Sequence, residues 1–314
     1  MHILILGGTR FFGRRVVEIL VAAGHELTLL SRRSVSDFQM VRHICAEKLP
    51  GLKILKGSRF DLVLDFICYD GDGPTEVAEN VFFKRYIMIS STWVPRLWNG
   101  LCADELHAEL ISPISKLPPV TLSYLRGKVF AEMAVINLRK SGREAVSLRL
   151  PIMLGEGDYT GRFDFYRHRF ADGGPLIAVA GGKNSAQIAV MDDLAKALVR
   201  WVELVDINRL PIWEGLPGEG RSVQSILHQM ASSLGVKINL IDVSVTELEI
   251  NFPFFLDHEP FWRESPLPVT EANIYDAVGL TPAVFGHGLY TLAPNATSAN
   301  VNLRLEELRF LANR

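Results

Sequence analysis

The start of the chain alternates between two hydrophobic patterns. Ile3–Leu6 is a continuous apolar run that ends at Gly7, and such a run predicts a strand buried on both faces. From Phe12 onward apolar residues recur at helical spacing with charged residues between them, and Gly24 marks a stop. Glu26–Leu30 predicts a second buried strand. Strand, helix and strand within about 30 residues predict a βαβ unit with a right-handed crossover.

The alternation continues along the first half of the chain. It predicts strands at Val41–Ala46, Asp61–Phe66, Arg85–Ser90 and Ala145–Leu150, with a long helix at Leu122–Arg139. Strands that alternate with helices pair in parallel, because each crossover helix returns the chain to the end of the sheet at which the previous strand began. We therefore expect an α/β fold: a Rossmann-type, doubly wound parallel sheet with helices on both faces.

After Pro151 the pattern loosens, and a smaller C-terminal α+β domain is expected. Short strands and helices alternate there with Pro-rich stretches, at Leu176–Val179, Gln187–Val190, Met191–Leu204, Val223–Leu234 and Pro253–Pro268. The segment near 186–215 can return to the sheet. The expected division is 1–150 with 186–215 as the first domain, and 151–185 with 216–314 as the second.

Composition narrows the class of protein. Of 314 residues 48% are apolar, which fits a globular protein, and the net charge of −2 argues against a general nucleic-acid-binding surface. No apolar run approaches the roughly 20 residues of a membrane helix, and the N-terminal run is too short for a signal peptide. Cys45, Cys68 and Cys102 follow no disulfide or metal-site spacing, so we expect free thiols, a cytoplasmic location and no metal.

The first junction between strand and helix is rich in glycine. Glycines at such a turn let a pyrophosphate approach the backbone, and the helix N-terminus supplies N–H groups and a positive dipole end. The turn predicts a dinucleotide site, with an ordinary tight turn as the alternative; its residues are Gly7, Gly8, Thr9, Arg10, Phe11, Phe12 and Gly13. Arg10 stands where the motif expects its middle glycine, and it either reaches an anionic group of the cofactor or faces solvent.

The second strand leads into two arginines, Arg32 and Arg33. An NAD site favours an acid here to hold the ribose hydroxyls, whereas arginine accommodates the 2′-phosphate of NADP. The segment Leu30–Arg33 contains no acid, so NADP is favoured over NAD, although arginine pairs also occur on ordinary surfaces.

Hydroxyl groups and a lysine mark candidate chemistry downstream. Of the seven tyrosines only Tyr124 has a lysine four residues later, and residues at that spacing share a helix face. The Lys128 ammonium would stabilise the Tyr124 phenolate, as acid–base work near neutral pH requires; a surface contact is the alternative. Ser91 and Thr92 follow a predicted strand, where ligands of parallel sheets bind, although serines are also common in turns.

These segments together resemble the extended short-chain dehydrogenase/reductases, the NAD-dependent epimerase/dehydratase type. The resemblance rests on GGTRFFG (7–13), YIMISSTWV (86–94), YLRGKVFAE (124–132) and LRLPIMLGEGD (148–158). It is nearest to an atypical branch with GGTRF in the first turn, which includes chloroplast stem-loop-binding proteins and bacterial reductase-like members. It implies that the first domain binds the dinucleotide and the second binds the substrate.

The resemblance also implies roles for single residues. Tyr124 is the general acid/base, Lys128 holds the nicotinamide ribose and acidifies Tyr124, and Ser91 orients the substrate oxygen with Thr92 as a fallback. Glu47 would lie near the adenine, and Arg149 would contact the substrate.

Two segments depart from the family pattern. One is Arg10; the other is Phe66–Tyr69, which replaces the usual small residues beside the nicotinamide. About 15 residues then lead to the next strand, so the helix between them is short by βαβ standards. Because that helix contributes to the dimer of the family, we expect a monomer or a different dimer.

The expected activity is that of an NAD(P)-dependent oxidoreductase or epimerase, acting by hydride transfer on a hydroxyl or carbonyl group, with a sugar nucleotide as the favoured substrate. The basic stretch that contains Arg162, Arg167 and Arg169 could bind a substrate diphosphate or be a solvated face. Epimerisation and ketone reduction stay open, because both need hydride transfer and one acid/base group. The alternatives are an RNA-binding protein on the same fold and an NADP-sensing regulator without catalysis.

Overall fold

The chain forms two compact units in the computed structural model, which describes residues 1–34, 38, 40–96, 119–218, 220–262, 272–282 and 298–314. Unit 1 comprises Met1–Pro151, Asp192–Leu216 and Thr270–Thr281. Unit 2 comprises Ile152–Met191, Pro217–Val269 and Pro282–Arg314. No helix among the described residues combines the length and apolar character needed to cross a bilayer.

Unit 1 is built on a seven-stranded parallel sheet with the order β11-β6-β5-β4-β1-β2-β3. The strands are β1 (His2–Leu6), β2 (Glu26–Ser31), β3 (Val41–Cys45), β4 (Arg59–Asp65), β5 (Phe82–Ser91), β6 (Glu144–Leu150) and β11 (Ile212–Glu214). The strand order reverses at β1, so the chain leaves β1 and β4 in opposite directions. Ligands of open α/β sheets bind at such a switch point, beyond the carboxyl ends of the strands.

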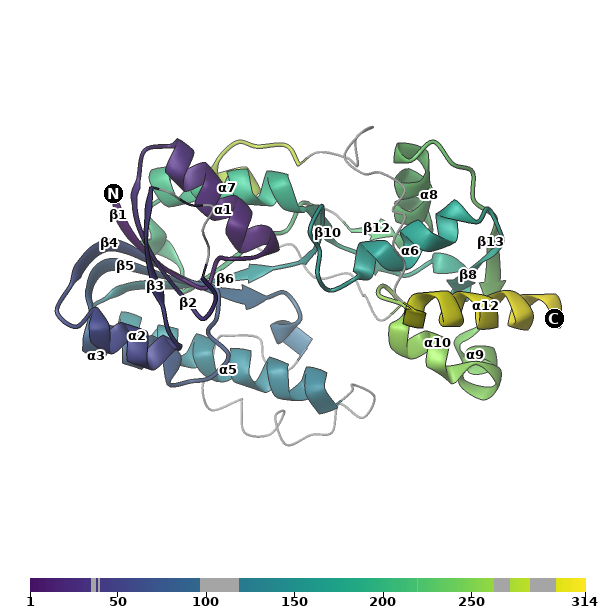
Figure 1. Ribbon diagram of the computed structural model, residues 1–314, viewed down its shortest axis with the longest axis horizontal. Coiled ribbons are helices and arrows are strands. Elements are labelled where there is room, and N and C mark those ends of the chain that lie inside the picture. Colours follow the sequence, from purple (N-terminus) through teal and green to yellow (C-terminus); the bar gives the residue numbers. More distant parts are fainter. Residues whose placement is uncertain (35–37, 39, 97–118, 219, 263–271, 283–297) are drawn as a thin grey trace. The chain divides into compact units, whose positions relative to one another are not determined.

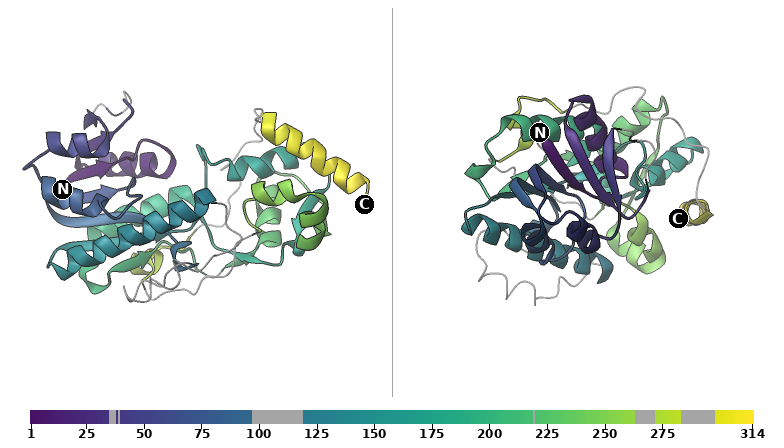
Figure 2. Two further views of the ribbon diagram at one scale, coloured as in Figure 1. Left: turned by 90° about the horizontal axis from the view of Figure 1, so that it is seen from below. Right: turned by 60° about the vertical axis from the view of Figure 1, so that its left-hand side comes forward.

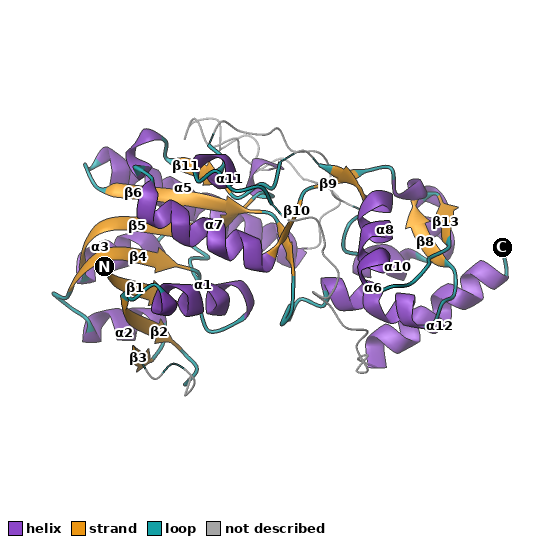
Figure 3. Cartoon of the chain, turned by 90° about the horizontal axis from the view of Figure 1, so that it is seen from above, coloured by secondary structure: helices purple, strands orange, loops and turns teal. Residues whose placement is uncertain are grey.

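Helices cover both faces of this sheet (Figure 1). α1 and α7 lie on one face and α2, α3 and α5 on the other, and Figures 2 and 3 show the same layers from other directions. The helices of unit 1 are α1 (Phe11–Ala22), α2 (Lys48–Ile54), α3 (Gly73–Asn80), α5 (Pro119–Lys140), α7 (Met191–Leu204) and α11 (Ile274–Ala277). Because both faces are covered, Ile3–Leu6 of β1 are fully buried.

The sequence predicted this architecture, and the predicted Rossmann-type sheet is confirmed. The α2 helix was missed because its sequence contains Pro50 and Gly51. Proline is tolerated in the first turn of a helix, and Gly51 is required because a Cβ there would lie 2.1 Å from Leu30 Cδ1. The helix after β4, α3, is short, as the spacing predicted.

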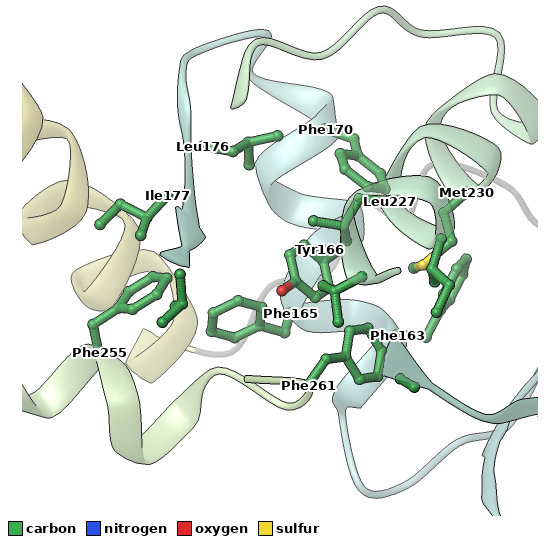
Figure 4. Packing of buried hydrophobic residues seen from close by; sticks show 14 of the residues in the cluster. Phe163, Phe165, Tyr166, Phe170, Leu176, Ile177, Leu227, Met230, Phe255 and Phe261 are labelled. Atoms are coloured by element: carbon green, nitrogen blue, oxygen red, sulfur yellow. The ribbon is translucent and has the colours of Figure 1, made fainter. Parts of the chain in front are cut away.

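The described residues of unit 2 form three two-stranded sheets together with several helices. The strands are β7 (Ile152–Leu154), β8 (Leu176–Val179), β9 (Ser185–Ala186), β10 (Ile188–Val190), β12 (Arg221–Ser222) and β13 (Leu240–Val243). The helices are α6 (Arg162–Ala171), α8 (Val223–Ser233), α9 (Val245–Asn251), α10 (Pro253–His258) and α12 (Ser298–Ala312). Aromatic side chains such as Phe163, Tyr166, Phe255 and Phe261 fill the core of this unit (Figure 4).

The expected domain boundaries differ from these units at two places. Residues 186–191 lie in unit 2, where β10 within this segment pairs with β7. Residues 272–281 lie in unit 1, although they were expected in the second domain. The cause is hydrogen bonding to the end of β11 and the residues that follow it: Glu214 N donates to Ala272 O at 2.8 Å, and Asn273 Nδ2 donates to Leu216 O at 2.7 Å.

Candidate functional site

The glycine turn closes tightly between β1 and α1. Gly7 and Gly8 have φ angles of +85° and +74°, which side chains with a Cβ rarely adopt. A Cβ on Gly13 would lie 2.7 Å from Gly8 Cα, so the helix can start against the turn only with glycine there. A Cβ on Gly7 would lie 2.6 Å from Ile67 Cγ2, which places the segment after β4 next to the turn.

The N-terminus of α1 suits an anion. Arg10 is the N-cap residue of α1 and has an extended backbone. All residues of α1 are described, and the Arg10 side chain forms no capping hydrogen bond with them. The first turn contains no acidic residue. Thr9 and Phe11 are partly buried. Phe12 is buried with its ring 6.0 Å from that of Phe66, so it can offer a ligand its backbone N–H but not its ring. The glycine turn, the N-terminus of α1 and their place at the switch point of the sheet together fit the pyrophosphate of a dinucleotide.

The candidate adenosine residues lie together at the carboxyl ends of β2 and β3. Arg32 and Arg33 are exposed, and Arg32 Nη1 lies 4.0 Å from Glu47 Oε1. The Ser31 hydroxyl donates to Arg33 O at 2.9 Å and the Cys45 thiol to Arg32 O at 3.4 Å, which holds the turn in shape. The two side chains of the Arg32–Glu47 pair are more than two-thirds exposed, so the pair is weak and both groups are available to a ligand.

α5 brings Tyr124 and Lys128 together at the carboxyl edge of the sheet. The Lys128 ammonium lies 5.8 Å from the centre of the Tyr124 ring and donates to Cys68 O and Ile89 O, each at 2.7 Å. Burial lowers the pKa of Lys128 to about 8, although the nearby Cys68, Asp65 and Glu132 oppose that shift. Tyr124 is 40% exposed, so its phenol can meet a ligand, whereas Lys128 beneath it is 2% exposed. The expected contact of Lys128 with the nicotinamide ribose stays a prediction.

A second tyrosine, Tyr69, lies beside this pair. The sequence resemblance placed the segment Phe66–Tyr69 beside the nicotinamide but gave Tyr69 no role. Its ring centre is 4.6 Å from Lys128 Nζ and 6.1 Å from the Tyr124 ring centre. The sequence carried two signals for it: Tyr69 follows a predicted strand at the end of the sheet where ligands bind, and it belongs to the segment that departs from the family pattern.

The hydroxyls after β5 point in different directions. Ser91 is partly buried, and its Oγ accepts a hydrogen bond from Trp93 N at 3.2 Å, which leaves its own proton to donate. Thr92 is buried and donates to Leu150 O at 3.3 Å. Thr92 therefore joins β5 to β6 and is no substitute for Ser91, contrary to the expectation for it. Ser90 donates to Glu132 Oε1 at 2.5 Å.

Arg149 has a different role from the expected substrate contact. It is 4% exposed, and its guanidinium forms two hydrogen bonds to Glu132, from Nε at 3.0 Å and from Nη2 at 2.7 Å. Glu214 lies 3.8 Å from its third nitrogen. With its donors engaged inside unit 1, Arg149 joins β6 to α5 and is not proposed as a substrate ligand.

The basic stretch in unit 2 is not a single cationic face. Arg162 Nη1 donates to the Thr160 hydroxyl at 3.1 Å and is partly exposed. Arg167 pairs with Asp164 at 3.2 Å, and Arg169 is buried against Glu307 at 2.8 Å. Of the three arginines, Arg162 is the one that stays a substrate candidate, since neither of the others fits a solvated anion-binding face.

A cluster of polar side chains lies next to the site around Asp65. Asp65 at the end of β4 accepts from Lys48 at 2.8 Å, from Tyr86 at 2.9 Å and from the Ile67 amide at 3.0 Å. Burial together with Asp65 raises the pKa of the Cys68 thiol to about 12, so this cysteine stays protonated and unreactive. Within the described part of the chain, no group of His, Cys, Asp or Glu side chains is placed to hold a metal ion.

The sheet, the glycine turn and the tyrosine–lysine pair define the Rossmann-type class of α/β proteins, as the sequence resemblance to the extended short-chain dehydrogenase/reductases predicts. No protein-family model matches the chain. Among solved structures, the fold is similar to UDP-glucose 4-epimerase from Thermotoga maritima with UDP-glucose, at a TM-score of 0.60, 15% identity and full coverage of both chains. It is also similar to dTDP-glucose 4,6-dehydratase from Bacillus anthracis in complex with NAD, at a TM-score of 0.56, 13% identity, and 89% and 96% coverage. At these identities the likeness establishes the fold.

The curated relatives that match by sequence include a stem-loop binding protein and a reductase. A chloroplast stem-loop binding protein of 41 kDa from Arabidopsis thaliana is 27% identical over 227 residues, 63% of this chain and 54% of that protein. A bifunctional pinoresinol-lariciresinol reductase from Thuja plicata is 40% identical over 58 residues, 18% of this chain and 19% of the reductase. The chain therefore matches about half the length of the first relative and about a fifth of the second.

Proposed function

We propose that the protein is an NAD(P)-dependent oxidoreductase or epimerase of the extended short-chain dehydrogenase type, and that it acts on a sugar nucleotide. The observation that carries the proposal is the placement of Lys128 beneath Tyr124, at the sheet edge that also holds the glycine turn. Sugar-nucleotide epimerases and a dehydratase share the fold, which supports the substrate class.

The residues of the chain divide the chemistry between them. A bound nicotinamide cofactor supplies or accepts a hydride at the substrate carbon. Gly7, Gly8 and the first N–H groups of α1 hold its pyrophosphate. Tyr124 gives a proton to, or takes one from, the substrate oxygen, because the ammonium of Lys128 favours its phenolate form. Ser91 donates a hydrogen bond to the same oxygen.

The cofactor preference is proposed as NADP over NAD. The exposed Arg32 and Arg33 lie at the end of β2, where a 2′-phosphate would be held, and guanidinium groups suit bidentate phosphate contact. Glu47 next to Arg32 is the acid that would instead favour unphosphorylated ribose.

The test is Tyr124→Phe in the full chain, with Tyr159→Phe as the matched control on an exposed tyrosine in unit 2. Cofactor affinity is measured by fluorescence titration with NADPH and NADH, and turnover with a panel of UDP- and dTDP-sugars. We expect cofactor binding to survive in Tyr124→Phe, while turnover falls by roughly 100-fold or more because the proton-transfer group is gone. Unchanged turnover would remove Tyr124 from the mechanism, and binding without turnover in the unmodified protein would favour a cofactor sensor.

The name of the Arabidopsis relative favours RNA binding as the second candidate function. The net charge of −2 weighs against it, because RNA affinity depends on cations that neutralise phosphates. A stem-loop RNA titrated at two salt concentrations decides the matter: tight binding that weakens steeply with salt would support this function over the enzyme.

We further propose a cytoplasmic protein that is monomeric or forms a dimer unlike that of the family. The described cysteines, Cys45 and Cys68, are free thiols, which fits a reducing compartment. α3 has eight residues and offers little surface for a helical interface. A tight dimer in light scattering that surface substitutions on α5 dissociate would contradict the oligomeric part.

A further inference from the structure

Two aromatic rings cover one buried lysine in unit 1. Lys128 is 2% exposed, whereas Tyr124 and Tyr69 are 40% and 52% exposed. The Lys128 ammonium is 4.6 Å from the Tyr69 ring centre and 5.8 Å from that of Tyr124. Both distances allow an attraction between the cation and the ring, and Tyr69 makes the closer contact.

Backbone packing fixes the position of Tyr69. A Cβ on Gly127 would lie 2.0 Å from Tyr69 O, so the backbone of Tyr69 packs directly against α5. The contact is at Gly127, the residue that precedes Lys128. The Lys128 ammonium donates to the preceding carbonyl, that of Cys68, at 2.7 Å. A Cβ on Gly71 would lie 3.3 Å from Phe130 Cβ, which extends the same contact along the helix. The segment 68–71 is therefore packed onto the helix that carries the reacting pair.

We propose that Tyr69 is a positioning residue of this site: its ring covers Lys128, holds the ammonium against the Cys68 and Ile89 carbonyls, and excludes water from it. The inference rests on the proposed function only for the reactive roles of Tyr124 and Lys128. Tyr69 acts through Lys128, which in turn acts on Tyr124.

The environment of Lys128 gives this role a measurable consequence. The titratable and charged groups around it are Cys68, Asp65, Glu132 and Lys48. Burial is the largest cause that lowers the pKa of Lys128 to about 8. Removing the Tyr69 ring admits water and moves this pKa back toward the ordinary value of a lysine, while the surrounding charges stay in place.

Reductive methylation with formaldehyde and a borane reductant, followed by peptide mass spectrometry of the full chain, measures how accessible Lys128 is. The variants are Tyr69→Phe, which keeps the ring, Tyr69→Leu, which keeps apolar bulk, and Tyr69→Ala, which removes both. Tyr159→Ala is the control for loss of an exposed tyrosine. Above the midpoint of every variant, where the amine is neutral, we expect the wild type and Tyr69→Phe to label equally slowly. Tyr69→Ala should label roughly three- to tenfold faster there, because the ring no longer shields the amine from the reagent.

The pH dependence of labelling is the second readout. Its midpoint should lie at about 8 in the wild type and higher in Tyr69→Ala. The proposal would be overturned if Tyr69→Ala labelled at the wild-type rate with the wild-type midpoint. It would also be overturned if Tyr69→Phe labelled as fast as Tyr69→Ala. If circular dichroism shows that Tyr69→Ala is misfolded, Tyr69→Leu decides instead, with an intermediate rate expected and a wild-type rate refuting. Full turnover in Tyr124→Phe would refute the proposed function and leave this result unaffected.

Discussion

Arg149→Ala should destabilise unit 1 strongly, because it would leave a carboxylate buried without its partner. Glu132 is fully buried and receives two hydrogen bonds from Arg149, at 3.0 and 2.7 Å. After the truncation the Ser90 hydroxyl still donates a hydrogen bond to the Glu132 carboxylate. Breaking a buried ion pair on one side costs about 3–5 kcal/mol, and the geometry here is bidentate, so we expect a loss in that range.

Urea denaturation followed by tryptophan fluorescence measures this loss. Trp201 and Trp213 are buried in unit 1 with their rings 5.3 Å apart, so their emission reports on the unit that contains Arg149. The matched control is Arg14→Ala, which removes a partly exposed pair with Glu18 and should cost about 0.5 kcal/mol.

The double variant Arg149→Met with Glu132→Leu should recover much of the stability, because apolar residues of similar volume often replace a buried pair at little cost. A loss below about 1 kcal/mol in Arg149→Ala would refute the reasoning, since that is the value of a surface pair. A stable variant with a raised KM for substrate would restore the role that the sequence resemblance implied for Arg149.

Three further predictions follow from single contacts. Gly127→Ala places a Cβ 2.0 Å from Tyr69 O; it should cost about 1–3 kcal/mol in urea denaturation and speed Lys128 methylation, and unchanged values would contradict the packing of this segment. Replacing Arg32 and Arg33 together by alanine should weaken NADPH binding by roughly tenfold and leave NADH binding unchanged in fluorescence titrations, because charge-assisted phosphate contacts are lost; equal losses would argue against an NADP site. Burial raises the pKa of Glu259 from 4.5 to about 7, so the folded state binds its proton more tightly, and stability should fall as pH rises through that range by up to about 1.4 kcal/mol per unit. Glu259→Gln should flatten this dependence of the melting temperature, and an unchanged slope would exclude Glu259 as its source.

The sheet was predictable because apolar residues dominate its central strands, although Ser147 and Arg149 interrupt β6. Ile3–Leu6 and Ala145–Leu150 are buried on both faces, and such runs differ clearly from the helical spacing between them. β13 and α12 of unit 2 were missed. β13 is four residues long and only partly buried, and α12 has no clear apolar stripe in its sequence.

The site was predictable where its residues are close in sequence. Tyr124 and Lys128 share a helix face by spacing alone, and the glycine turn is a contiguous motif. The contact of Tyr69 with Lys128 joins residues that are far apart along the chain, and no periodicity announces it. The pairing of Arg149 with Glu132 is a similar case, because a sequence shows a cation at a strand end but not which carboxylate will meet it.

Burial along one face of α5 connects the reactive pair with the stability of the unit. Tyr124, Lys128 and Glu132 follow at intervals of four residues and are 40%, 2% and 0% exposed, so the helix leads from the ligand-facing edge into the core. Glu132 accepts hydrogen bonds from Ser90 on β5 and from Arg149 on β6. Ser90 adjoins Ser91, and one carboxylate therefore fixes both the strand end that carries the candidate substrate hydroxyl and the helix that carries Tyr124. For this reason a substitution at Arg149 should lower turnover through misplacement of Ser91 and Tyr124, even though its guanidinium contacts no substrate.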